Sequence, residues 1–258
     1  MREMSMRKAV VFGVCAAFAA VMAFAQEGGE DPAKAGLTPE ERRQKILAVT
    51  GGMVQSHGSG GDLLVLDLTG GACGPAVAET ARLVGEVLKV RVRHEAGKPP
   101  KGGDPSAVIR AALAKTNVAA VVAIVSDKSR PHLLVAPEDR WAALNVARVL
   151  GAGGGAQVRD ARLRKSVWRA VGFMMGAGNS GTPQCPFRPV LAVEELDAGF
   201  QLAPAAIAAM GVYARAAGVA QIRQTTYRKA CEEGWAPAPT NDFQRAVWDE
   251  VKGKNNNN

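Results

Sequence analysis

The sequence predicts a mixed α/β domain with a partly parallel sheet, and three observations carry that prediction. A short apolar run at residues 63–68 is bounded by Asp62 and Gly70, which is typical of a buried strand. Apolar residues at helical spacing follow as far as Leu88, and residues 90–94 then alternate like a second strand. Strand, helix and strand within about thirty residues form a βαβ unit, which requires parallel pairing.

Composition limits the class of protein. The chain has 258 residues, 47% of them apolar, and a formal net charge of +8. These values fit one domain with an appendage, and they exclude a disordered chain and a polytopic membrane protein. Four cysteines are too few for a disulfide scaffold, and the three histidines, His57, His94 and His132, limit histidine-based chemistry.

The basic residues are scattered along the chain, and their densest cluster lies in a predicted helix. Its members are Arg159, Arg162, Arg164, Lys165 and Arg169. Because apolar positions alternate with them, we interpret this cluster as a solvated helix face. Nucleic-acid binding is therefore not expected, whereas weak association with an anionic surface stays open.

The first 25 residues have the pattern of a secretory signal peptide. Basic residues precede an apolar run at residues 9–23, and small residues at positions 23 and 25 suit cleavage. We therefore expect residues 1–25 to direct export to the periplasm or the extracellular space, and residues 26–37 to be a flexible leader. Whether the signal is cleaved or kept as an anchor stays open.

The remaining elements follow from capping patterns and apolar periodicity. Thr38 to Glu41 form a capping box, which predicts a helix to Val49, and residues 51–61 are a glycine-rich loop. Further along the chain we expect a linker at 97–105, a helix at 106–115, a strand at 118–125, apolar segments at 133–135 and 141–149, and helices at 161–175 and 205–217.

The C-terminal part is predicted to be a strap with short helices. Residues 219–251 contain two short helical segments, at 226–233 and 242–251. The last residues, 252–258, end in four asparagines and are predicted to be disordered.

A regular glycine spacing marks the end of the helix at 161–175. Residues 169–180 are Arg-Ala-Val-Gly-Phe-Met-Met-Gly-Ala-Gly-Asn-Ser, four residues separate this stretch from Cys185, and Phe187 and an acidic stretch at 194–197 follow. The segment resembles the active-site region of archaemetzincins, a zincin family of metalloproteases. Their motif is HExxHxxGxxHC, then four residues, Cys, one residue and Met. The resemblance implies a zincin-like domain at 38–218, with a mostly parallel mixed sheet, an active-site-type helix and a helical C-terminal tail.

The chemically defining residues of that motif are replaced. The positions that the resemblance assigns to zinc ligands hold Arg169, Phe173 and Asn179, and neither a guanidinium nor a phenyl ring donates a lone pair to zinc. The amide of Asn179 is a poor zinc donor. Ala170 stands where the family has the glutamate that takes a proton from the metal-bound water. We therefore expect no metal, no cofactor and no zinc-dependent hydrolysis.

With those residues replaced, the segment keeps the scaffold glycines, which shape the helix and the turn after it. Gly172, Gly176 and Gly178 are expected where the helix packs closely and the chain reverses. The family's second, cysteine-bound zinc is not expected either. Ser180 occupies its first cysteine position, and only Cys185 remains of that set.

Three cysteines follow the predicted signal peptide, and export favours one disulfide among them. Cys185 and Cys231 are the candidate pair. Cys73 would then be the odd thiol, either reactive at the start of a helix or buried and idle.

Three functions stay open at this point. The first is an exported, catalytically inactive metalloprotease-like domain, a pseudoprotease that binds a peptide or protein. The second is an envelope-associated structural protein. The third is a hydrolase with a different mechanism, with Cys73 or Cys185 as nucleophile and a histidine as base, or with acidic residues as acids and bases. The acidic candidates are Asp62, Asp67 and Glu95.

Overall fold

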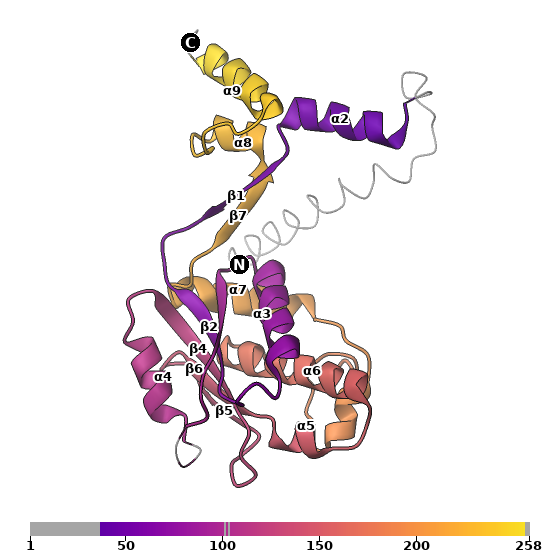
Figure 1. Cartoon of the computed structure of the whole chain (residues 1–258), viewed down its shortest axis with the longest axis vertical. Helices are drawn as coiled ribbons and strands as arrows, with labels where there is room; N and C mark the ends of the chain where they lie inside the picture. The colour runs from indigo at the N-terminus through magenta and orange to yellow at the C-terminus, as the bar shows by residue number, and fades with distance from the viewer. Residues whose placement is uncertain (1–36, 101, 103, 256–258) are drawn as a thin grey trace, which may run out of the picture. The chain divides into compact units, whose positions relative to one another are not determined.

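The computed structural model describes residues 37–100, 102 and 104–255 (Figure 1). The predicted signal peptide, and the predicted leader apart from its last residue, lie outside the described residues. Within the described part, no helix is long and apolar enough to cross a membrane. The chain divides into two compact units, residues 54–225 and a second unit in which residues up to 53 join residues from 226 onward.

The larger unit is built around a five-stranded sheet of order β3-β2-β4-β6-β5. Its parallel strands are β2 (Asp62–Asp67), β3 (Val92–Ala96), β4 (Val118–Val125) and β6 (Trp141–Asn145). Strand β5 (Leu133–Ala136) pairs antiparallel with β6 at one edge. The predicted mixed, mostly parallel sheet is confirmed.

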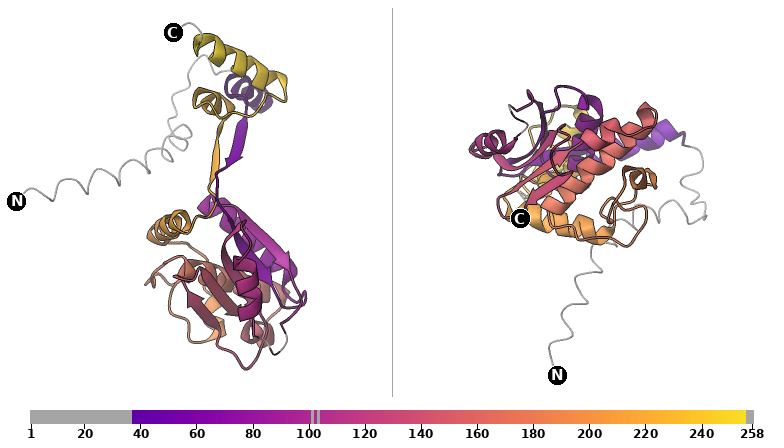
Figure 2. Two further views of the ribbon diagram at one scale, coloured as in Figure 1. Left: turned by 90° about the vertical axis from the view of Figure 1, so that its left-hand side faces the viewer. Right: turned by 90° about the horizontal axis from the view of Figure 1, so that it is seen from below.

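Helices cover both faces of this sheet, which explains why β2 and β4 are continuous apolar runs (Figures 1 and 2). Leu63 and Val65 join the core beneath α3 (Gly74–Leu88), α6 (Ala156–Met174) and α7 (Pro204–Ala216). Leu64 and Leu66 point to the opposite face and pack in a smaller core with α4 (Ser106–Leu113). Alternate residues of β2 therefore pack into two different cores, one on each face of the sheet.

Several predicted elements differ in their bounds. The segment 141–149 resolves into β6 followed by the short helix α5 (Ala147–Gly151). Helix α6 begins at Ala156 rather than at residue 161, directly after an extended Gly155. The predicted loop at 51–61 contains strand β1 (Met53–His57), which pairs with β7 (Ile222–Thr226) in a separate two-stranded sheet.

The second unit combines α2 (Pro39–Thr50), α8 (Tyr227–Glu232) and α9 (Asp242–Asn255). The capping box forms as predicted, since Glu41 N–H donates to Thr38 Oγ1 at 3.2 Å and Thr38 N–H donates to Glu41 Oε2 at 2.7 Å. The predicted domain at 38–218 includes this first helix. In the structure it contacts α8 and α9 instead, because the described N-terminal and C-terminal segments form one unit.

The end of the chain also differs from the sequence prediction. Helix α9 continues through Asn255, so residues 252–255 of the segment predicted to be disordered are helical. The side chain of Trp248 on α9 packs near the buried ring of Tyr227, and the ammonium of Lys252 lies 4.1 Å from the Trp248 ring centroid. Residues 256–258 lie outside the described residues.

Candidate functional site

Helix α6 and the loop after it hold the motif positions. Ala170 is fully buried, so the place of the family's glutamate is part of the apolar core. Helix α6 ends at Met174, and the chain reverses at Gly176, whose φ of 80° lies in the left-handed region; Ala177 N–H donates to Gly172 O at 2.8 Å. This closure of a helix end favours glycine at the reversing residue.

Gly172 is required by close packing. A Cβ atom added there would lie 2.0 Å from Phe187 Cε1, and the Phe187 side chain is fully buried. Phe187 meets Phe173 edge to face, with ring centroids 5.9 Å apart. Gly178 has neither feature, because its φ is not left-handed and an added Cβ would contact nothing within 4 Å.

Arg169 and Phe173 contact each other. Arg169 is 8% exposed, and its Nη1 donates to the carbonyl oxygens of Pro186 and Arg188 at 2.5 Å each. Its guanidinium carbon lies 5.2 Å from the Phe173 ring centroid. Asn179, the third of these motif positions, is exposed.

Three of the five basic residues on α6 do not lie on a solvated face, which corrects the sequence interpretation for them; Arg159 is exposed and Arg164 is half-buried. Arg162, Lys165 and Arg169 are all buried. Arg162 binds Asp197 with Nε and Nη2, both at 2.7 Å, and the Lys165 ammonium donates to Leu196 O. These cations hold a partner segment, so they lie between two packed elements rather than in water.

The partner segment is the 3₁₀ helix η2 (Val193–Asp197), which contains the acidic stretch of the motif. Glu195 receives a hydrogen bond from Arg188 at 3.1 Å, and that contact lowers the pKa of the carboxyl. The pKa of Asp197 is also lowered, mainly by the hydrogen bonds from Arg162. The acidic residues therefore hold η2 against α6 and against the loop that contains Arg188.

The candidate acids of the non-zinc hydrolase are engaged elsewhere. Asp62 forms ion pairs with Arg91 and with Arg93, and Glu95 pairs with Arg93 at 3.1 Å. Asp67 is buried at the end of β2, where its Oδ1 accepts from Thr69 N–H at 2.9 Å and from Thr69 Oγ1 at 2.7 Å.

The candidate nucleophiles are not paired with a base. Cys73 and Cys185 are each 2% exposed, and burial raises the pKa of the Cys73 thiol. Among the described residues, no hydrogen bond joins a cysteine to His57, His94 or His132. A buried thiol with a raised pKa and no base is a poor nucleophile.

The disulfide expected between Cys185 and Cys231 does not form in the structure. Both residues and Cys73 carry free thiols. Cys185 is buried in the core of the larger unit, whereas Cys231 belongs to α8 in the other unit. Both cysteines lie in the last third of the sequence, but that does not indicate that they belong to different units.

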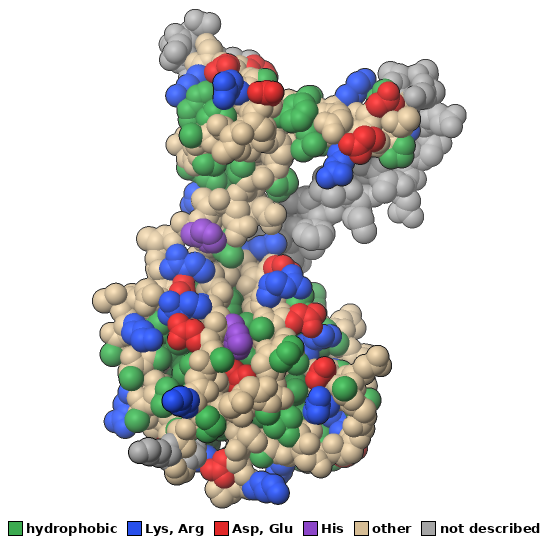
Figure 3. Space-filling model, viewed as in Figure 1, with side chains coloured by type: hydrophobic (Ala, Val, Ile, Leu, Met, Phe, Trp, Pro, Cys, Tyr) green, Lys and Arg blue, Asp and Glu red, His purple; other side chains and the backbone are tan. Residues whose placement is uncertain are grey.

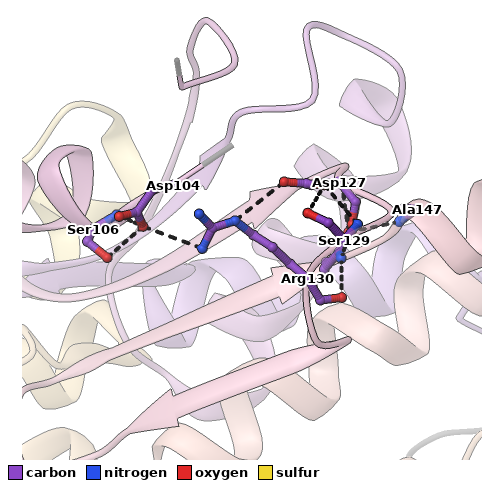
Figure 4. Close-up of polar contacts among 7 residues, drawn as sticks. Asp104, Ser106, Asp127, Ser129, Arg130 and Ala147 are labelled. Carbon is purple, nitrogen blue, oxygen red and sulfur yellow. Dashed lines mark hydrogen bonds and ion pairs between the residues drawn. The ribbon is translucent and has the colours of Figure 1, made fainter. Parts of the chain in front are cut away.

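A polar cavity that was not predicted from the sequence lies at the carboxyl ends of β4 and β6, and Figure 4 shows the polar contacts of the loops beside it. Asn145 organises its loop: the side-chain oxygen accepts from the backbone N–H groups of Asp127 at 3.0 Å and Ala147 at 3.1 Å. Arg130 bridges Asp104 and Asp127 at 3.6 and 3.4 Å. The signal available in the sequence was the set of polar residues directly after two parallel strands, where ligands often bind.

This cavity has a volume of about 480 Å³ and a mixed lining. Asp127, Lys128, Arg130 and Arg148 contribute charges of both signs. Hydrogen bonds from Ser129 lower the pKa of Asp127, which keeps its carboxylate charged and tied to its own loop. On the face seen in Figure 3, basic and acidic side chains likewise alternate without one continuous basic patch.

Comparison with known proteins identifies the class of fold. No family model matches the chain, and no curated protein matches it. Among solved structures it is similar to an archaemetzincin from Methanopyrus kandleri, with a TM-score of 0.50 and 16% identity over 61% of this chain and 97% of that one. A zinc-dependent peptidase from Methanocorpusculum labreanum gives a TM-score of 0.45 at 13% identity, over 57% of this chain and 99% of that one.

The larger unit is thus a mixed α/β domain with a metalloprotease-like fold. More particularly, its fold is archaemetzincin-like, and the resemblance predicted from the motif is confirmed at the level of the fold. The residues present do not fit the zinc of that family, because Arg169 and Phe173 offer no donor atom and Arg169 brings a positive charge. Within the described part of the chain, no three His, Cys, Asp or Glu side chains gather as a metal site would require.

Proposed function

We propose that the chain is an exported, catalytically inactive zincin-fold domain that binds an extended peptide or protein segment. The observation that carries the proposal is the state of Arg169. Its guanidinium is buried against the Phe173 ring and bonded to two backbone carbonyls, at a position that the motif resemblance assigns to a zinc ligand. Neither a Lewis acid nor a general base is then available for peptide hydrolysis.

The binding surface in this proposal is the free edge of β5. Among the described residues, this strand ends the sheet order next to β6 and pairs with no other strand, and α6 packs against both strands. The side chains of Leu134 and Val135 are 42% and 38% exposed. An unpaired strand edge with apolar side chains is a template on which an extended peptide adds as a further strand.

The hydrogen-bond register identifies which backbone groups face that edge. Asn145 N–H donates to His132 O at 2.7 Å, so His132 and Asn145 form a hydrogen-bonded pair. Such pairs alternate along an antiparallel ladder, and Leu134 opposite Ala143 is therefore the next one. The N–H group of Val135 consequently points away from β6 and toward the free edge.

Binding is tested with fluorescent peptides from an unbiased library, measured by anisotropy on the chain from residue 26 onward. Val135→Pro removes the outward N–H without removing a bond to β6, and we expect it to abolish binding. Val135→Ala keeps the N–H and should bind within a few-fold of the parent. Equal binding by the parent and Val135→Pro, with both folded by circular dichroism, would refute binding at β5.

Inactivity and export are tested on the natural protein. Protein purified without chelators or a histidine tag is expected to contain no stoichiometric zinc by mass spectrometry, and to leave casein intact when zinc is added. One zinc per chain, or cleavage that a chelator stops, would contradict the proposal. Export predicts that the mature protein, recovered outside the cytoplasm, begins near residue 26.

A further inference from the structure

Helix α6 carries two buried arginines two helical turns apart, and the first shows a complete set of partners. Arg162 Nη1 donates to Gly153 O at 2.7 Å. Its Nε and Nη2 bind the two carboxylate oxygens of Asp197, each at 2.7 Å. This side-on bidentate geometry is the strong form of an arginine–carboxylate pair.

Arg169 repeats the arrangement without the carboxylate. Its Nη1 is engaged by the carbonyl oxygens of Pro186 and Arg188, as Nη1 of Arg162 is engaged by a carbonyl. Its Nε is buried and has no hydrogen-bond partner among the residues that the structure describes. No carboxylate within the described chain forms an ion pair with Arg169, so the edge made by Nε and Nη2 is unused.

The surroundings do not compensate this charge. Lys165, one turn away, is also buried and bonded to a backbone carbonyl, and Arg188 is positive as well. The two carboxylates nearby are already engaged, Asp197 by Arg162 and Glu195 by Arg188. Burial and then the repulsion from Arg188 lower the pKa of Arg169, and the nearby Cys185 opposes that shift only in part, which agrees with a cation that lacks a full counter-charge.

A buried guanidinium without a counter-charge is costly, and the Phe173 ring offsets only part of that cost. We propose that the missing counter-charge belongs to the ligand, and that Arg169 binds a carboxylate through its Nε and Nη2. This inference rests on the proposed function, because it makes the carboxylate part of the bound peptide. The carboxylate comes from a peptide C-terminus or from an Asp or Glu side chain.

The geometry favours a carboxylate over a phosphate. Both oxygens of a planar carboxylate match the Nε–Nη2 edge, as Asp197 does on Arg162. The carbonyl oxygens of Pro186 and Arg188 lie against the same guanidinium. They would repel the additional negative charge of a phosphate more than that of a monoanion.

The first experiment needs no variant. Acetate is titrated into the chain from residue 26 onward at constant ionic strength, with chloride as the control, and the arginine Nε–H resonances are followed by NMR. We expect the Arg169 resonance to shift with acetate and not with chloride. The Arg162 resonance should not shift, because Asp197 already binds the Nε–Nη2 edge of that guanidinium. An Arg169 resonance that does not respond to acetate overturns the inference.

The second experiment separates the two sources of the carboxylate. One peptide that binds the parent is prepared with a free C-terminus, with an amidated C-terminus, and amidated with each Asp and Glu replaced by its amide. If amidation of the C-terminus lowers the affinity by about tenfold or more, the peptide C-terminus supplies the carboxylate. If the affinity falls by that much only when Asp and Glu are also replaced by their amides, an acidic side chain supplies it.

Two variants complete this test. Arg169→Lys keeps the charge without the two-pronged edge, and Arg169→Met removes the charge; both should erase the difference between the charged and uncharged peptides. Equal affinities of all three peptides for the parent would overturn the carboxylate inference and leave peptide binding at β5 standing. A response of Arg169 to acetate in a protein that binds no peptide would support the carboxylate site and refute the proposed function.

Discussion

At the residue scale, the packing around Gly172 explains how the motif helix is stable with Phe173 and Phe187 beside it. Gly172 leaves room for the Phe187 ring, and Phe187 in turn supports Phe173 edge to face. The guanidinium of Arg169 lies over Phe173 and is bonded beyond it to the carbonyls of Pro186 and Arg188. The absence of a Cβ at residue 172 therefore makes room for the packing of Phe187, Phe173 and Arg169.

Gly172→Ala is expected to destabilise the protein by about 1–3 kcal/mol, the usual cost of overpacking a core. The added Cβ would lie 2.0 Å from Phe187, whose ring is fully buried and has no free space to enter. Gly178→Ala is the matched control, because its added Cβ contacts nothing. Urea unfolding monitored by tryptophan fluorescence compares the two; equal midpoints would show that the contact does not restrain residue 172.

At the element scale, η2 and α6 form one assembly joined by polar contacts. Asp197 binds Arg162, and Leu196 both fills the core and accepts a hydrogen bond from Lys165. In the sequence, the acidic stretch is part of the family resemblance, and the basic residues were interpreted as a solvated helix face. It did not show that the two sets bind each other, because the partners lie 35 residues apart in the case of Arg162 and Asp197.

Asp197→Asn tests this assembly through pH. The pKa of Asp197 is lowered from 3.8 by the hydrogen bonds from Arg162, so its contribution to stability is present above pH 3.8 and is lost as pH falls through the lower folded value. The variant should be less stable than the parent at pH 6, and its stability should decline less steeply below pH 3.8. Thermal unfolding at several pH values measures both effects.

The matched control for that series is Glu194→Gln. Glu194 lies on the same 3₁₀ helix, is exposed and forms no ion pair within the described part of the chain. Its unfolding temperature should follow that of the parent at each pH. A parallel loss in both variants would mean that net charge, and not the pairing of Arg162 with Asp197, sets the acid sensitivity.

At the scale of the whole molecule, the sequence predicted the sheet because its strands are apolar runs with clear boundaries. It did not predict the second unit, since α2 has no buried side chain and so no apolar pattern that indicates its partners. One contact that joins this unit runs from a side chain to a backbone carbonyl far away in the sequence: Arg228 Nε donates to Val49 O at 2.8 Å. The partners of Arg169 were hidden for a similar reason, because backbone carbonyls leave no trace in residue type.

The division into two units predicts that residues 54–225 fold by themselves. Both core clusters of the sheet consist only of residues within this range, and the buried Trp168 reports on the larger core by its fluorescence. The fragment should unfold in one cooperative transition and show the blue-shifted emission of a buried indole. A fragment of residues 54–200 is the control: it lacks α7, whose Met210 and Ala214 are fully buried in that core, and it should not fold. If the longer fragment also fails to fold, α2, α8 and α9 are required for the α/β domain, and the chain unfolds as one cooperative unit.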